Sequence, residues 1–517
     1  MKQLKWQKEC LEQWEANGFK GIVNAVTGSG KTFLALCAVK MLMDMDDPRP
    51  LKIKIVVPKT FLLYQWRNEL IEFFEIPRES IGFYSGEHKT KDDCKFMIYV
   101  INSARYSLAR HIVRDIKSGE RVLLIADECH HYSSEENSKI FDFIHYVSYN
   151  APYYTLGLSA TPYGKRYNEI LVPALGDEIY HYTILHALKE NVISKFIVFN
   201  VSVPFNWVEA DEYEELSNRL TNALNRLKRV VPTLYIDNGQ DLFMRLENII
   251  KNAEPNIAKL ARQVLSLSIR RKELVYLAKH KLDCVTDIVS SVDKSDNVII
   301  FSERIETAEE IYKRLLKLDP NNVGLYHSKI SKDQRKNLLR QFENNEIKVL
   351  VSCKTLDEGL NIPEADVGII VSTTGSRRQR IQRLGRILRK KHNDRSAKLY
   401  YLFVRNTTDE EGVLEELTRD SLNESMNVVN VRYNENNGAF FNAHFKELVA
   451  TAVSEMSNNN HDTRLIGEFL HHAKTGLLTG EWLLNEDVCV KKIESATNKA
   501  EKNYYIAMLM LIKARSR

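Results

Sequence analysis

Two short segments of this chain carry side chains that can bind and cleave a nucleoside triphosphate. The first is the run at 25–32, Ala-Val-Thr-Gly-Ser-Gly-Lys-Thr, and the second is the pair Asp127-Glu128, followed by Cys and His. Backbone N–H groups of a Gly-rich loop can surround a phosphate, a Lys ammonium can reach the β- and γ-oxygens, and a Thr hydroxyl can reach magnesium. Adjacent carboxylates can hold that ion and activate water. Together the segments predict a site for a magnesium-bound nucleotide.

The surroundings of the first segment decide how it is interpreted, because Ala25 stands where the strict phosphate-loop pattern has Gly. A short apolar run precedes the loop, and 33–43 has apolar residues at helical spacing, so the loop is predicted to join a strand to a helix N-terminus. Anions are favoured at that position. The apolar run 121–126 likewise predicts a buried parallel strand that ends at the two carboxylates. Taken alone, either segment could be an ordinary turn or a solvated strand end.

Further segments, in chain order, resemble the ATPase core of the superfamily 2 helicases and translocases, specifically the DExH group. The segment Ser159-Ala160-Thr161, followed by Pro, resembles the third motif of that family, 355–363 resembles the fifth, and 382–389 resembles the sixth. The spelling Asp-Glu-Cys-His is closer to the XPB-like and restriction-enzyme branch than to the DEAD-box RNA group. One departure is Asn361, where the family commonly has Asp. This change removes a formal charge near the coupling region.

The resemblance implies a role for each matching residue. The catalytic residues would be Lys31, Asp127, Glu128, Gln382, Arg386 and Arg389. The nucleotide would contact Gln7, Thr27, Gly28, Ser29, Gly30, Lys31, Thr32 and Gly359, with Mg²⁺ at Thr32 and Asp127. Ser159, Ala160 and Thr161 would couple hydrolysis to nucleic acid. Arg386 and Arg389 would act as arginine fingers, because a planar, permanently charged guanidinium can stabilise a γ-phosphoryl transition state. The Gln7 amide can donate and accept at once, as an adenine edge requires, although it could equally be an exposed helix residue.

The implied nucleic-acid contacts are mostly small polar residues that follow strand-like runs, as contacts to phosphates require. They are Pro58, Lys59, Thr60, Ser85, Gly86, Asn102, Ser103, Ser302, His327, Ser328 and Thr355. Each of these residues, taken alone, could instead cap a helix or form a turn.

Composition sets limits on the class of protein. A chain of 517 residues, 44% of them hydrophobic, can form two α/β domains with additions. The net charge of +5 is small, so nucleic-acid binding would need a local positive cleft. Seven cysteines without Cys-x-x-Cys spacing favour a reducing compartment and do not suggest zinc or iron–sulfur. His461, His471 and His472 lack spaced acidic or Cys partners and are predicted to be surface residues. With no apolar targeting or membrane-spanning segment, we expect a cytoplasmic location.

Segment patterns predict an α/β architecture. Apolar strands alternate with helical patterns in 1–205 and 291–411, which predicts two parallel sheets covered by helices; the resemblance makes them tandem RecA-like domains. Residues 206–290 are charged and read as a helical insertion or linker, for which packing beside the second domain is favoured over DNA contact. Residues 412–517 are predicted to be a mainly helical C-terminal extension of unknown role, where a protein partner could bind.

The resemblance implies an ATP- and Mg²⁺-dependent motor on nucleic acid. DNA, whether single-stranded, duplex or branched, is favoured over RNA by the motif spelling, and repair, recombination or phage defence are plausible settings. Two alternatives stay open. One is a translocase that moves on duplex DNA without separating its strands. The other is an ATP-gated DNA-binding subunit that recruits an effector nuclease.

Overall fold

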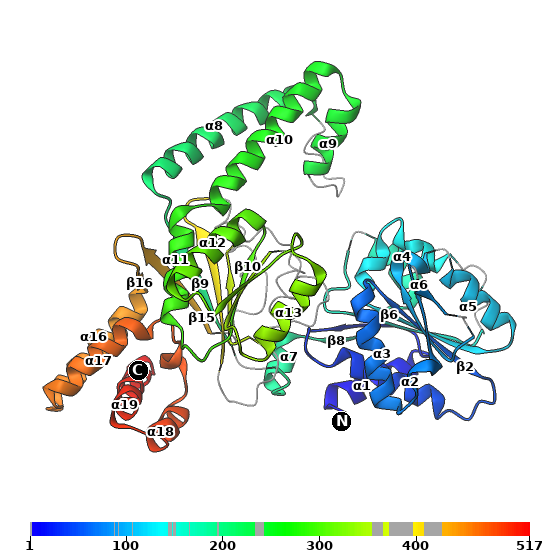
Figure 1. The fold of residues 1–517 in the computed structure, drawn as a ribbon, viewed down its shortest axis with the longest axis horizontal. Coiled ribbons are helices and arrows are strands. Elements are labelled where there is room, and N and C mark those ends of the chain that lie inside the picture. Colours follow the sequence, from blue (N-terminus) through cyan, green and yellow to red (C-terminus); the bar gives the residue numbers. More distant parts are fainter. Residues whose placement is uncertain are drawn as a thin grey trace. The chain divides into compact units, whose positions relative to one another are not determined.

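A computed structural model describes most of the chain and divides it into two compact units (Figure 1). The described residues are 3–86, 88–90, 93–105, 107–142, 147, 151–164, 166–193, 196–232, 242–353, 365–371, 396–407 and 427–516. Those up to 193 belong to the first unit, and those from 196 belong to the second. In each unit the described residues build one sheet of eight strands. Parallel pairs predominate in both sheets, which confirms the predicted α/β fold.

The sheet of the first unit has the strand order β4-β3-β5-β2-β6-β7-β1-β8, and only β4 is antiparallel. Its strands are β1 Ile22–Ala25, β2 Leu51–Val57, β3 Ile81–Ser85, β4 His88–Lys89, β5 Phe96–Val100, β6 Arg121–Asp127, β7 Tyr153–Ser159 and β8 Glu178–Tyr182. Every residue of β6 is buried, as expected for a central parallel strand with both faces covered. The near-continuous apolar runs in the sequence therefore do mark the centre of this sheet.

Helices cover both faces of the first sheet. They are α1 Lys5–Ala16, α2 Lys31–Met43, α3 Thr60–Phe74, α4 Ile101–Ala104, α5 Leu108–Lys117, α6 Val172–Leu175 and α7 Ile184–Lys189. On one face, α4, α5 and the short turns at 129–133 and 137–141 share a core with Val122, Leu124 and Ala126 of β6. Within the described ranges, no helix is both long and apolar enough to cross a bilayer.

The sheet of the second unit has the order β11-β12-β10-β13-β14-β9-β15-β16, and only β16 is antiparallel. Its strands are β9 Phe196–Val203, β10 Val298–Ser302, β11 Val323–Tyr326, β12 Val349–Cys353, β13 Val367–Ile370, β14 Ala397–Val404, β15 Asn427–Asn434 and β16 Ala439–Phe441. The boundary predicted at 205/206 falls after β9, whereas the two units divide at 195/196. The reason is that β9 is fully buried and pairs along its whole length with β14 and, on its other side, with β15.

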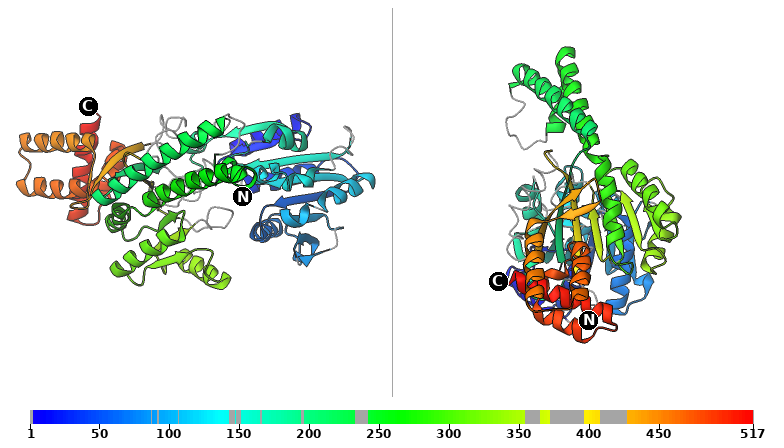
Figure 2. Two further views of the ribbon diagram at one scale, coloured as in Figure 1. Left: turned by 90° about the horizontal axis from the view of Figure 1, so that it is seen from above. Right: turned by 90° about the vertical axis from the view of Figure 1, so that its left-hand side faces the viewer.

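Residues 206–290 form two different parts. The helices α8 Trp207–Val230, α9 Leu242–Asn252 and α10 Pro255–Tyr276 have a small core of their own, to which Leu216, Leu246 and Val264 belong. Figures 1 and 2 show α8 and α10 side by side. In contrast, α11 Lys279–Ser291 packs on the second sheet through Leu282 and Val285. The insertion therefore ends before α11, and it meets the sheet at its base, where Val275 contacts the cluster of Val404.

The C-terminal region is a structural part of the second unit. The strands β15 and β16 extend the sheet. Further helices in the described part of this unit are α12 Ile305–Leu318, α13 Lys332–Glu343, α16 Ala443–Asn458, α17 Thr463–Gly476, α18 Glu486–Glu494 and α19 Lys499–Arg515. Phe445 of α16 and Leu511 of α19 share one core with Phe199 of β9. The buried Tyr400 hydroxyl of β14 donates to the Leu478 carbonyl at 2.8 Å. The extension predicted as a helical accessory domain thus supplies both strands and core.

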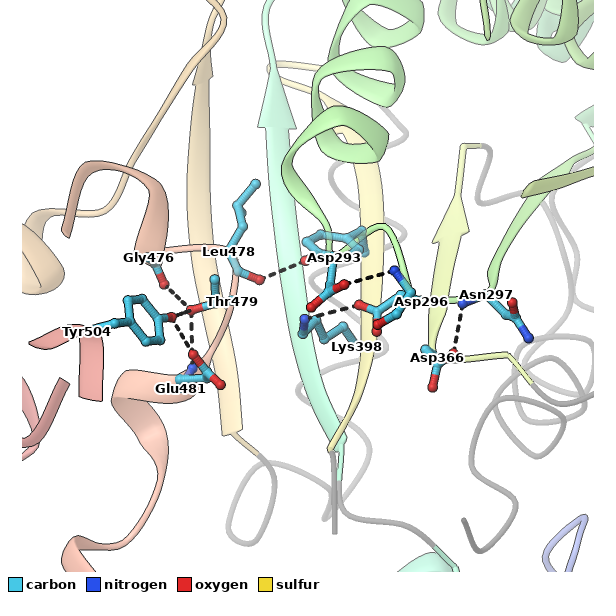
Figure 3. Close-up of polar contacts among 12 residues, drawn as sticks. Asp293, Asp296, Asn297, Asp366, Lys398, Gly476, Leu478, Thr479, Glu481 and Tyr504 are labelled. Carbon is cyan, nitrogen blue, oxygen red and sulfur yellow. Dashed lines mark hydrogen bonds and ion pairs between the residues drawn. The ribbon is translucent and has the colours of Figure 1, made fainter. Parts of the chain in front are cut away.

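Figure 3 shows polar contacts within the second sheet and others within the C-terminal region. Lys398 Nζ of β14 lies 3.5 Å from the Asp296 carboxylate, just before β10. On the C-terminal side, the Tyr504 hydroxyl of α19 donates to the Glu481 carboxylate. The first contact joins β14 to the segment before β10, and the second joins α19 to the short turn at 481–483.

Removal of residues 412–517 is expected to unfold or aggregate the second unit, because it strips β15 from β9 and exposes the apolar core. The measurement is soluble yield and sedimentation of the truncated chain beside the full chain. Val490→Ser, a change at a position that is 40% exposed on α18, serves as the control and should stay soluble. A truncated chain that remains monomeric with an unchanged circular dichroism spectrum would contradict this description of the core.

A buried ion pair should contribute strongly to the stability of the first unit. Lys54 Nζ on β2 lies 2.5 Å from the Asp115 carboxylate on α5, and both side chains are almost fully buried. Lys54→Met leaves the buried Asp115 carboxylate with the partly exposed Arg114 at 2.6 Å, so we expect a loss of about 3 kcal/mol in unfolding free energy, at the lower end for a broken buried pair. Urea denaturation measures it. Lys52→Met on the same strand breaks a more exposed pair with Glu120 and should cost about 1 kcal/mol or less. Equal losses in the two variants would refute the prediction.

Candidate functional site

The predicted functional segments of the first unit meet at the carboxyl edge of its sheet. Because all strands except β4 run parallel, the ends of β3, β5, β2, β6, β7 and β1 follow one another along this edge. The ends of β3, β5 and β2 lead into the predicted nucleic-acid contacts at 85–86, 102–103 and 58–60. The ends of β6, β7 and β1 lead into Asp127-Glu128, 159–161 and the loop 25–32. We call these two parts of the edge the nucleic-acid half and the nucleotide half, after the roles that are predicted for their residues.

The loop 25–32 has the backbone conformation that its glycines permit. Gly28 and Gly30 have φ of 85° and 90°, in the left-handed region where a side chain would be strained. Ala25 is the fully buried last residue of β1, outside that left-handed stretch. Ala is thus compatible with the position, and the departure from the strict pattern leaves the loop intact.

The loop holds a cation and an unsatisfied hydroxyl, a combination that fits a phosphate group. Lys31 Nζ donates to the Ala25 carbonyl at 2.9 Å and lies 3.4 Å from that of Val26. Burial lowers the pKa of Lys31, while the Glu128 and Asp127 carboxylates act to raise it. Thr27 Oγ1 is buried and has no hydrogen-bond partner among the described residues. These groups lie at the N-terminus of α2, where a phosphate would gain free N–H donors.

Asp127 presents a carboxylate at the end of β6. One oxygen, Oδ2, accepts from Trp66 Nε1 at 2.8 Å, and the other accepts from the Glu128 amide at 3.0 Å. Burial, followed by the neighbouring Glu128 charge, raises the pKa of Asp127 to about 6. Magnesium in nucleotide sites takes one or two protein oxygens together with phosphates and water. The Asp127 carboxylate and the Thr32 hydroxyl are hard oxygen donors that fit such an ion.

Glu128 is connected to the third predicted motif through His130. Glu128 has a φ of 47°, an unusual conformation for a non-glycine residue that is held by its surroundings. Its carboxylate lies 3.4 Å from His130 Nδ1, which is 2.9 Å from Ser159 Oγ. Ser159 Oγ also accepts from the Thr161 amide at 3.0 Å. His130, which was not among the predicted site residues, therefore joins the Glu128 carboxylate, predicted to activate water, to the predicted coupling segment.

Gln7 links α1 to the phosphate loop in this structure. It is 1% exposed; its Nε2 donates to the Gly30 carbonyl at 3.1 Å, and its Oε1 accepts from the Leu4 amide at 2.9 Å. Both ends of the amide thus have partners within the chain. Adenine recognition by Gln7 stays a prediction.

The nucleic-acid half presents accessible polar groups. Lys59 and Thr60 are exposed at the start of α3, and Asn102 is exposed on α4. The Gly86 amide donates to Ser103 Oγ at 2.6 Å, which joins the segments after β3 and β5. The structure therefore brings the predicted contacts of the first unit together on one surface, with the exposed cation that binding to phosphates requires.

The predicted contacts of the second unit lie at the corresponding edge of its sheet. Ser302 ends β10 and His327-Ser328 follow β11, with β12 between these two strands. Ser302 is 1% exposed, and its hydroxyl donates to the Arg304 carbonyl at 3.0 Å. His327 is 5% exposed and accepts from the Lys329 amide at 3.2 Å, whereas Ser328 is exposed. Ser302 and His327 therefore form hydrogen bonds within their own turns, and Ser328 is the accessible residue of these three.

Several predicted residues lie outside the described part of the chain. They are Thr355, Gly359, Gln382, Arg386 and Arg389. Their roles stay predictions.

Comparison with known proteins gives independent evidence on the family that this chain resembles. Residues 1–164 match the family model for the type III restriction enzyme res subunit, and 280–391 match that for the helicase conserved C-terminal domain. The chain is 27% identical over 405 residues to DNA 3'-5' translocase XPB2 of Sulfurisphaera tokodaii, covering 78% of this chain and 82% of the relative. It is 24% identical over 421 residues to the general transcription and DNA repair factor IIH helicase/translocase subunit XPB of Encephalitozoon cuniculi, covering 78% of this chain and 52% of that one. It thus spans most of the first relative and about half of the second.

A solved structure supports the fold. The crystal structure of the Pyrococcus furiosus Hef helicase domain superposes with a TM-score of 0.50 at 19% identity, covering 79% of this chain and 96% of the other. At this identity the likeness shows the fold alone.

Two substitutions should separate nucleotide binding from cleavage. Lys31→Ala removes the loop cation and is expected to abolish both binding and hydrolysis of ATP. Glu128→Gln keeps the shape of the side chain but cannot take a proton, so ATP should still bind while kcat falls about 100-fold or more. Nucleotide titration and a phosphate-release assay measure the two effects. Lys40→Ala, nine residues further along α2, is the control. Hydrolysis that persists in Lys31→Ala would contradict the site.

Proposed function

Since the chain belongs to the XPB-like branch of the superfamily 2 helicases and translocases, we propose that it is a DNA motor that hydrolyses ATP to move along or unwind DNA. The observation that carries this proposal is the division of one sheet edge into a nucleotide half and a nucleic-acid half. Both halves lie on the same sheet, so a structural change in one half can alter the positions of residues in the other.

In the proposed reaction Lys31 binds the β- and γ-phosphate oxygens, while Thr32 and Asp127 hold Mg²⁺. Bound Mg²⁺ would supply charge neutralisation on those oxygens. Glu128 orients the attacking water and accepts its proton, a role that its position at the end of β6 supports. Arg386 and Arg389 are the proposed source of the guanidinium charge that stabilises the transition state.

We propose that hydrolysis is converted into movement by cycles of closure and opening of the two ATPase units. His130 and Ser159 connect the water-activating carboxylate to the coupling segment, and this contact supports the first step of such a conversion. Alternating grips on one DNA strand would then give directional steps.

The choice of DNA follows the names of the two relatives, a DNA translocase and a DNA repair factor subunit. Repair, recombination or phage defence is the proposed setting. The proposed compartment is the reducing cytoplasm, in which all seven cysteines can remain the free thiols seen here. A protein partner bound by the C-terminal region is part of the proposal.

ATPase rates with single-stranded DNA, duplex DNA, forked DNA and RNA test the proposal. We expect DNA to raise kcat by about tenfold or more, a barrier change of about 1.4 kcal/mol, and RNA to raise it less. Lys31→Ala and Glu128→Gln are the inactive controls. A rate that no nucleic acid changes would refute the motor.

A translocase that leaves the strands paired is the second candidate, because the first relative is named a translocase. Strand displacement and triplex displacement measured in parallel distinguish the two activities. Triplex release without unwinding would identify the chain as a translocase and contradict the helicase activity.

A further inference from the structure

The two halves of the functional edge meet between β2 and β6, and hydrogen bonds cross this junction. One crossing is the bond from Trp66 on α3 to the Asp127 carboxylate. A second is the Tyr132 hydroxyl, which lies 2.7 Å from the Asp127 carbonyl and 2.9 Å from that of Val56 on β2. A third runs through side chains from Arg105 to His131. The Tyr132 crossing and the Arg105 crossing both end on backbone carbonyl groups, whereas the Trp66 crossing ends on a carboxylate that is assigned to the reaction.

Trp66 connects a predicted nucleic-acid contact directly to Asp127. Its helix, α3, begins at Thr60, immediately after Lys59, and Trp66 lies about 9 Å further along the helix at about 1.5 Å per residue. The indole is 1% exposed, and its N–H points to the carboxylate oxygen at 2.8 Å. A displacement of the start of α3 that moved the helix as one body would therefore change the position of the indole that contacts Asp127.

Asn137 makes a similar connection to the segment after Glu128. Arg105 follows α4, which carries Asn102 and Ser103, and its Nε and Nη2 both donate to Asn137 Oδ1, at 2.9 and 2.6 Å. The amide Nδ2 of Asn137 donates in turn to the His131 carbonyl at 2.7 Å.

The connection through Asn137 continues to the water-activating carboxylate. The rings of His131 and His130 are in contact, with centroids 4.2 Å apart, and His130 contacts both Glu128 and Ser159. The side-chain oxygen of Asn137 thus accepts hydrogen bonds from Arg105 on the nucleic-acid half, and its side-chain nitrogen donates one to the His131 carbonyl on the nucleotide half.

We propose that Trp66 and Asn137 are positioning residues that couple nucleic-acid binding to the orientation of Asp127 and Glu128. This inference rests on the proposed function. Nucleic acid bound at 58–60 and 102–103 fixes the starts of α3 and α4. The indole then holds Asp127 in the orientation that Mg²⁺ requires, and the Arg105–Asn137 bridge holds the backbone of 128–131, in which Glu128 has its left-handed conformation.

Trp66→Phe tests the first connection, because it keeps an aromatic ring in the core and removes only the N–H donor. Trp14→Phe is the matched control: Trp14 is also fully buried, and its Nε1 donates at 2.8 Å to the Thr155 carbonyl, which has no part in the site. We expect Trp66→Phe to weaken binding of Mg²⁺·ADP about tenfold by calorimetry and to reduce DNA-stimulated kcat about tenfold. Trp14→Phe should change neither quantity.

Asn137→Asp tests the second connection, because it keeps the oxygen that Arg105 binds and removes the donor to His131. DNA-stimulated kcat should fall about tenfold, while ATPase without DNA and affinity for DNA stay within about twofold. Lys139→Ala is the control, since Lys139 lies on the same short turn and forms an exposed ion pair with Glu136. It should retain full stimulation.

Full stimulation in both Trp66→Phe and Asn137→Asp would overturn the coupling role. A loss of DNA affinity as large as the loss of stimulated kcat would also overturn it, because these residues would then support the nucleic-acid surface alone. The third contradicting result is a loss of stimulated kcat in the two control variants that equals the loss in Trp66→Phe and Asn137→Asp. The proposed motor function fails separately, if the unmodified protein shows no stimulation by DNA. In that case Mg²⁺·ADP binding by Trp66→Phe still decides whether Trp66 positions Asp127.

Discussion

Parallel pairing of the strands is the constraint on which the functional part of the first unit depends. A parallel strand must return to the same edge before it can pair again, so every β-α connection leaves a loop at the carboxyl ends. In the order β3, β5, β2, β6, β7 and β1, these loops carry six segments that are separated in sequence by up to about 135 residues. The sheet thereby places three polar segments beside three nucleotide-binding segments without any direct sequence relation between them.

Side chains at the middle of this edge form hydrogen bonds between its two halves. Trp66 donates a hydrogen bond across the junction to Asp127, and Asn137 accepts hydrogen bonds from Arg105 on the other half and donates one to the His131 carbonyl. Buried polar groups cost free energy unless they are paired, so such bonds are formed in a defined geometry. The same reasoning applies to Lys54, whose charge is buried within β2 and matched by Asp115.

Much of the fold followed from residue patterns. Largely apolar runs such as 121–126 identified buried parallel strands, and the Gly-rich loop before a segment with apolar residues at helical spacing identified the start of α2. The predicted boundary at 205/206 differs from the observed division because β9 pairs with strands about 200 and 230 residues later, and no local signal records such a partner. For the same reason 427–441 was not recognised as an extension of the sheet. At the site, Lys31 and Asp127 were evident from the motif, whereas Trp66 and Asn137 were not, since their importance depends on which loop lies beside them.

Amide hydrogen exchange with each ligand in turn tests the central claim that one edge has two coupled halves. With DNA, we expect slower exchange at 59–60, 85–86 and 102–103, and with Mg²⁺·ADP at 26–32. Because the halves are joined through α3 and the segment 128–137, either ligand alone should also slow exchange in 127–131. Protection by DNA that avoids all three segments of the nucleic-acid half would contradict the account.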